Sequence, residues 1–85
     1  MRVLIPSALQ SYTRQTWVEA SGETLAELLL DLDRQYTGIR FRMVDEQDRL
    51  RPHMRVFVQG QAVFDLALKL APHEPVHIVQ ALSGG

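Results

Sequence analysis

The chain has 85 residues, of which 46% are hydrophobic and 22% are charged, and its net charge is −1. These proportions are typical of one small globular domain, with a single core and little volume for a deep active-site cleft. The scattered basic residues argue against nucleic acid as a partner, and the absence of cysteine excludes disulfides and thiolate chemistry. The sequence begins with a strand-like run rather than a leader and has no apolar run of membrane length, so we expect a cytoplasmic protein with no membrane partner.

Two short strands are predicted at the start of the chain. Residues 2–5 are mostly aliphatic or β-branched, and the period of a strand places Val3 and Ile5 on one face and Leu4 on the other. Residues 15–20 form the second strand, which we expect to pair antiparallel with the first. A polar connection between them is expected to begin at Pro6-Ser7 and to continue to about Leu9.

The clearest local pattern is a helix that begins after Thr24. Thr24 and Glu27 have the spacing of a capping box, in which each side chain accepts a hydrogen bond from the other residue's amide. One apolar stripe at helical spacing then follows, formed by Leu25, Leu28, Leu29, Leu32 and Tyr36.

A short helical turn is predicted directly after this helix, at residues 39–44. Ile39 and Met43 are expected to pack under the main helix, and Phe41 is a third candidate for the same place. A solvated loop follows at 45–49, because those residues are almost all charged.

The second half of the chain predicts three more strands, at residues 54–59, 61–63 and 76–81. Gln59-Gly60 is typical of the tight turn of a hairpin. Residues 65–71 have no clear period and are expected to form a loop with at most one helical turn. The resulting fold class is α+β, and we predict a β-grasp (ubiquitin-like) domain over residues 1–81. Its mixed sheet has four to five strands with one main helix on one face, and the last strand lies beside the first.

No pattern in the sequence supports catalysis by the chain itself. His73 and His77 are four residues apart, but Pro72 and Pro75 argue against the helix that would bring them together, so no metal site is expected. No nucleophile elbow or phosphate-binding glycine loop is present. We therefore expect a carrier or a binding module rather than an enzyme.

The face of the predicted sheet that points away from the helix is the candidate docking surface. Its members are Leu4, Phe57, His77 and Val79, with Arg2, Arg55 and Gln80 at the margin. An exposed apolar patch with a polar margin is typical of a protein-binding site, and Phe57 would be its anchor. The alternative is that the loop at 64–70 folds over this face and buries it.

The chain ends in Gly84-Gly85, behind a predicted strand. Glycine packs almost nothing and orders at a high entropic cost, so such an end is a poor cap but a suitable thread through a narrow channel. A frayed terminus or a cloning remnant is the alternative. Residues 82–85 are accordingly assigned to a C-terminal tail.

Several segments, in their order and spacing, resemble the MoaD/ThiS family of ubiquitin-like sulfur carriers. They are Val3-Leu4-Ile5-Pro6, Ser21-Gly22-Glu23-Thr24-Leu25, Tyr36-Thr37-Gly38-Ile39, Val56-Phe57-Val58-Gln59-Gly60 and Val76-His77-Ile78-Val79, followed by Gly84-Gly85. Two departures are the proline-bracketed turn at 72–75, where such carriers often have Gly-Asp, and residues 80–82, where they often carry proline. The length favours the molybdopterin and cysteine branches over the shorter thiamine carriers.

The resemblance implies a function centred on Gly85. An E1-like adenylyltransferase/sulfurtransferase would use ATP to adenylate the Gly85 carboxylate, which then becomes a thiocarboxylate, while Leu82, Ser83 and Gly84 thread the partner's channel. A sulfur-accepting enzyme, of the molybdopterin-synthase large-subunit or cysteine-synthase type, would consume that sulfur. The carrier itself would bind no cofactor and would be a substrate rather than an enzyme. Two alternatives stay open: a protein modifier conjugated through Gly85, and a β-grasp interaction module.

Overall fold

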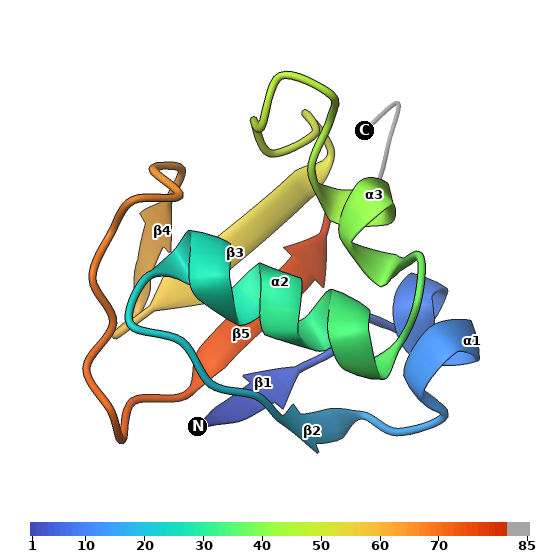
Figure 1. The fold of residues 1–85 in the computed structure, drawn as a ribbon, viewed down its shortest axis with the longest axis horizontal. Helices are drawn as coiled ribbons and strands as arrows, with labels where there is room; N and C mark the ends of the chain where they lie inside the picture. The colour runs from blue at the N-terminus through green and yellow to red at the C-terminus, as the bar shows by residue number, and fades with distance from the viewer. Residues whose placement is uncertain (82–85) are drawn as a thin grey trace.

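A computed structural model describes residues 1–81, and its centre is a five-stranded mixed sheet (Figure 1). The strands lie in the order β2-β1-β5-β3-β4. The β1–β5 pair is parallel and the other pairs are antiparallel. The bounds of the strands are β1 Arg2–Leu4, β2 Trp17–Glu19, β3 Met54–Val58, β4 Gln61–Val63 and β5 Val76–Gln80. The predicted α+β class and the β-grasp arrangement are confirmed, with each strand within two residues of its expected ends.

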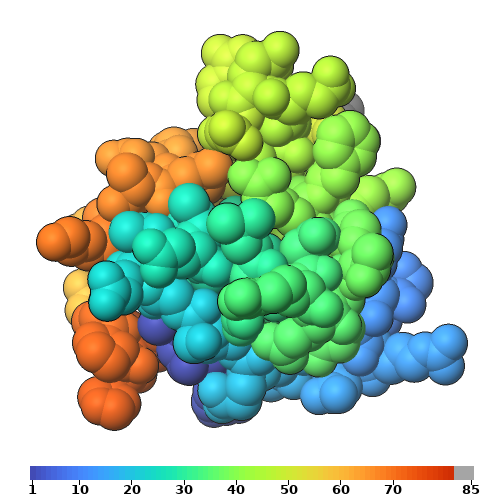
Figure 2. Space-filling model, in the orientation of Figure 1, coloured from blue at the N-terminus to red at the C-terminus, as the bar shows by residue number. Residues whose placement is uncertain are grey.

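The main helix, α2 (Leu25–Gln35), crosses one face of this sheet. Figure 2 shows that α2 and the segments joined to it cover this side of the molecule. The core between them is almost sealed from solvent, because the helical stripe and one side of each central strand meet there. Its fully buried members include Leu25, Leu28, Leu29 and Leu32 from the helix and Val3, Val56, Val76 and Ile78 from the sheet.

The start of α2 is capped largely as predicted. The Thr24 hydroxyl accepts a hydrogen bond from the Glu27 amide at 3.2 Å. The return bond differs by one residue, because the Glu27 carboxylate accepts from the Glu23 amide rather than from that of Thr24. Gly22 precedes the cap and lies against the first turn, where an added Cβ would be 2.5 Å from the Leu28 nitrogen. The chain can therefore pass this close to α2 only because residue 22 has no side chain.

The connection between β1 and β2 is helical, whereas the sequence predicted only a polar connection without helical structure. It contains a 3₁₀ turn at Ser7–Leu9 and the short helix α1 at Gln10–Thr13. Leu9 and Thr13 are buried, and the Thr13 hydroxyl donates to the Gln15 carbonyl at 2.7 Å. Leu9 and Thr13 are four residues apart, so a helical backbone places both side chains on the side that faces the core.

The short helix α3 (Ile39–Met43) follows α2, as expected. Ile39 and Met43 are fully buried, but the expectation that Phe41 packs beneath α2 was wrong, because its side chain is 56% exposed. In a helix, a residue two positions from a buried one lies on nearly the opposite side. Phe41 therefore faces solvent when both of its neighbours at that spacing face the core.

The β3–β4 hairpin turns at Gln59 and Gly60, with φ of 54° and 77°. When both central residues of a two-residue turn have positive φ, the twist of the turn matches the right-handed twist of the flanking strands. Glycine adopts a positive φ without steric cost. Within residues 1–81, no helix has the length and apolar character needed to cross a membrane.

Candidate functional site

The strand that precedes the tail occupies the middle of the sheet. β5 pairs with β1 on one side and with β3 on the other. The amide of Ala81, directly after β5, donates to the His53 carbonyl at 2.7 Å. The predicted sulfur-carrying residue Gly85 and the threading residues Leu82, Ser83 and Gly84 lie outside the described residues, so their roles stay predictions. Whatever follows Ala81 is attached to the central strand of the sheet, which is paired on both sides.

The four predicted docking residues lie on one surface, the side of the sheet opposite α2, which we call the open face. Leu4 is level with His77 on the neighbouring strand, and His77 is level with Phe57 on the next. Val79 lies two residues further along β5 and is 38% exposed. Leu4, Phe57 and His77 are each partly exposed. The sheet thus brings all four together, and their docking role stays a prediction.

Trp17 extends this surface, although it was not among the docking residues predicted from the sequence. It pairs with Leu4 across β2 and β1, and its ring meets that of His77 at 5.6 Å in an edge-to-face arrangement. The Arg2 guanidinium lies 4.3 Å from the centre of the Trp17 ring, close enough for a cation–π contact. The signal that could have found Trp17 is its alternation with the buried Val18 in a strand paired to β1.

The loop after β4 leaves the open face uncovered, so the alternative that residues 64–70 bury this face was wrong. The loop runs instead to the start of α2, where the Leu25 amide donates to the Leu68 carbonyl at 3.0 Å and the Leu70 amide donates to the Glu23 carbonyl at 2.9 Å. Phe64, at the beginning of the loop, is 61% exposed, and the Arg55 guanidinium lies 5.9 Å from its ring centre. An arginine stacked on an aromatic ring therefore marks each edge of the open face.

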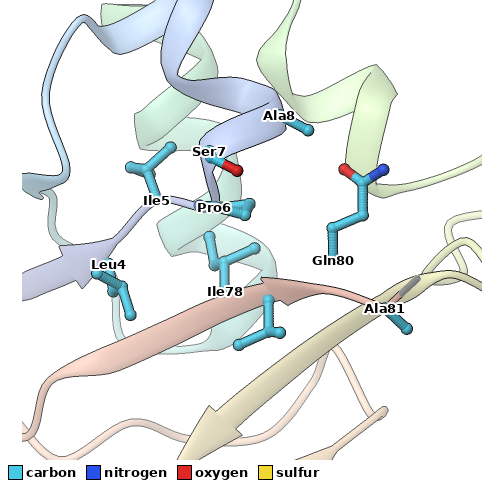
Figure 3. Close-up of a pocket in the computed structure, with 9 residues that line it drawn as sticks. Leu4, Ile5, Pro6, Ser7, Ala8, Ile78, Gln80 and Ala81 are labelled. Atoms are coloured by element: carbon cyan, nitrogen blue, oxygen red, sulfur yellow. The ribbon is translucent and has the colours of Figure 1, made fainter.

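A pocket of about 450 Å³ extends from the open face to Ala81, the last residue before the predicted tail (Figure 3). It lies between the end of β1 and the turn after it on one side and β5 on the other. Its lining is largely apolar and consists of Leu4, Ile5, Pro6, Ser7, Ala8, Ile78, Val79, Gln80 and Ala81. Leu4 and Val79 also belong to the predicted docking residues. A partner bound to the open face could therefore contact the pocket lining continuously as far as Ala81.

The acidic residues with perturbed pKa values have structural roles. Hydrogen bonding from the Ser21 amide, aided by Arg34 and Gln35, lowers the pKa of Asp31. The amides of Arg49 and Gln47 lower the pKa of Asp45 in the same way. Within residues 1–81, no group of three His, Asp or Glu side chains could hold a metal ion.

Solved structures of other proteins share the fold of this chain. One chain of the BexX/CysO complex of Amycolatopsis orientalis superposes with a TM-score of 0.90, at 30% identity over 99% of this chain and 98% of that one. The small archaeal modifier protein 1 of Haloferax volcanii superposes with a TM-score of 0.78 at 18% identity, over 96% and 97% of the two chains, which shows the shared β-grasp fold alone.

Sequence comparison gives the family. The sulfur carrier protein CysO of Mycobacterium tuberculosis is 34% identical over 89 aligned residues, which cover 98% of this chain and 96% of that protein. No family model matches the chain. The chain belongs to the MoaD/ThiS-type family of sulfur carrier proteins, whose members are carriers rather than catalysts.

Proposed function

We propose that this chain carries sulfur as a thiocarboxylate on Gly85. The observation that carries the proposal is the 34% sequence identity between this chain and a CysO sulfur carrier protein. The alignment covers nearly the whole length of both chains, and this sequence ends in Gly84-Gly85. A carboxylate is a poor electrophile, so it must be activated before sulfur can enter. An E1-like partner would supply that activation with ATP.

The proposed chemistry takes place in two steps on one carbon. A Gly85 carboxylate oxygen attacks the α-phosphorus of ATP, which releases pyrophosphate and leaves an acyl adenylate. Hydrosulfide then attacks the carbonyl carbon, the bond to the AMP oxygen breaks, AMP leaves, and the sulfur loses its proton. The product is a thiocarboxylate, whose sulfur is delivered as a nucleophile to a biosynthetic enzyme of the molybdopterin-synthase or cysteine-synthase type.

The described residues would contribute to this cycle by docking. Leu4, Phe57, His77 and Val79 share the open face, and the pocket beside Ala81 continues that surface to the tail. Holding the domain against the partner makes the encounter of Gly85 with ATP effectively intramolecular, which lowers its entropic cost. The complex that CysO of Amycolatopsis orientalis forms with BexX supports the idea that carriers of this fold are bound by a second protein.

Intact mass spectrometry tests the proposal. The full chain is incubated with the E1-like protein encoded in the same genome, ATP and sulfide, and a control omits ATP. Replacement of one oxygen by sulfur at Gly85, dependent on ATP, is the expected result. An unchanged mass with an active E1-like partner would refute it, and lysine-linked conjugates through Gly85 in cells would favour a modifier instead.

A further inference from the structure

A second surface flanks the root of the tail, and no docking role was assigned to it from the sequence. Phe41, Arg42, Arg51 and His53 line a hollow of about 300 Å³, and we call these four residues the Phe41 patch. Two of them belong to α3 and two to the segment that leads into β3. The patch is formed from the part of the chain between the main helix and the third strand, and none of its residues belongs to the open face.

The centre of the patch is an exposed aromatic ring held in place by an arginine. Phe41 is 56% exposed, and the Arg51 guanidinium lies 4.6 Å from its ring centre. The Arg51 Nε also donates to the Phe41 carbonyl at 2.8 Å, and the Arg51 amide donates to the Met43 carbonyl at 2.9 Å. Ring and guanidinium are thus positioned before any partner arrives. Aromatic and arginine side chains are enriched among the residues that dominate binding energy at interfaces.

The charge of the patch is positive. None of its four lining residues is acidic. Among residues 1–81, Arg42 makes no hydrogen bond or ion pair through its side chain. Two of the three acids in the neighbouring loop are engaged within the chain: the Asp45 carboxylate accepts from the Gln47 and Arg49 amides, and Asp48 pairs with Arg40 at 3.1 Å. The third, Glu46, is exposed and does not line the hollow. A guanidinium without an internal partner is suited to bind a carboxylate through two hydrogen bonds.

The backbone joins this patch to the tail. The His53 carbonyl accepts the Ala81 amide at 2.7 Å, so the patch borders the last described residue. A partner that receives Gly85 in its active site must extend to within a few residues of Ala81. The Phe41 patch therefore lies within reach of that partner, and it shares no lining residue with the open-face pocket, which ends at Gln80 and Ala81.

We propose that the Phe41 patch docks an acidic segment of the partner that processes Gly85, with an apolar side chain of that segment against Phe41 and a carboxylate on Arg42. The inference rests on the proposed function, since it assigns the occupant to the same partner. Docking at two separate surfaces that both adjoin Ala81 would fix the direction in which the tail leaves the domain.

Steady-state kinetics of thiocarboxylate formation test this inference, with the carrier as the varied substrate and intact mass as the readout. The test variants are Phe41→Ala and Arg42→Glu. Their matched controls are Leu30→Ala, an equally exposed apolar residue on α2, and Lys69→Glu, the same charge change beside Thr24 at the far end of that helix. Unfolding midpoints of all four variants are measured first, so that only folded proteins are compared.

Each test variant is expected to raise KM about tenfold with kcat nearly unchanged, while both controls behave as the wild type. The dependence of KM on salt should also become shallower for Arg42→Glu, because one screened charge pair is gone. Thiocarboxylate formation with an unchanged KM for both test variants would refute the patch and leave the function standing. An equal rise for Lys69→Glu would assign the effect to net charge and refute it too. If the wild type forms no thiocarboxylate, the proposed function fails and the patch loses its assigned partner with it.

Discussion

Trp17 and His77 meet edge to face above Leu4, with their ring centres 5.6 Å apart and their planes at 72°. The two residues come from β2 and β5, and β1 lies between them. Arg2 stacks on Trp17 as well. These contacts order the Trp17 and His77 rings before a partner binds, so less side-chain entropy is lost on association.

Phe57 should act as an anchor of the open face. Phe57→Ala is expected to weaken binding of the activating partner by about 2 kcal/mol or more, because a central aromatic side chain contributes most when it is fully desolvated. Isothermal titration calorimetry measures the change, with Leu30→Ala on the opposite side of the molecule as the control. An unchanged dissociation constant would remove Phe57 from the interface.

Trp17 offers a direct report on the same surface, because it is the chain's one tryptophan. Carrier labelled with 5-fluorotryptophan gives one ¹⁹F signal, which should shift or broaden as unlabelled partner is added. The same titration with Phe57→Ala should need more partner to reach the same change. A signal that stays in place while calorimetry detects binding would locate the partner elsewhere.

Gly22 should tolerate no side chain. In Gly22→Ala the new Cβ would be 2.5 Å from the Leu28 nitrogen and 2.8 Å from the Glu27 carbonyl carbon, so the backbone must shift. We expect a loss of about 1–3 kcal/mol in the free energy of unfolding, as in other overpacked sites. Urea unfolding measures it, and Ser21→Ala at the exposed neighbouring position is the control. Equal midpoints for the two variants would show that the close approach relaxes without cost.

Acid should destabilise the fold partly through Asp31. Its pKa is lowered in the folded state, chiefly by the hydrogen bond from the Ser21 amide, below the ordinary value of 3.8. The ionised group therefore stabilises the fold above that ordinary value, and the contribution is lost as the pH falls through the folded pKa. Urea unfolding from about pH 5 to pH 2 should show a steeper loss of stability for the wild type than for Asp31→Asn. Parallel curves would contradict this.

Gly84 and Gly85 should act through their lack of side chains. Gly84→Leu is expected to slow thiocarboxylate formation about a hundredfold, because a misplaced reacting group loses much of the benefit of positioning. Binding of the partner, measured by calorimetry, should stay close to that of the wild type, since the docking residues are unchanged. Ser83→Ala, which removes one oxygen and adds no bulk, is the control. A wild-type rate for Gly84→Leu would refute the threading role.

The elements with strong local signals were predictable. The stripe from Leu25 to Leu32 and the cap at Thr24 define α2, and alternation in β3 and β5 fixed which residues share the open face. The helical connection at residues 7–13 was not predictable in this way, because it has no apolar stripe and depends on burial of Leu9 and Thr13 by distant residues. Phe41 was misplaced because an apolar residue on a short helix carries no sign of which side meets the core.

The position of β5 has a mechanical consequence. This strand is bonded to β1 in parallel and to β3 along its whole length, and Ala81 continues it directly. A force applied to the tail along β5 acts on these two ladders side by side, so many hydrogen bonds resist it together instead of opening one after another. A partner could therefore pull on the end of the chain without unravelling the domain that it holds.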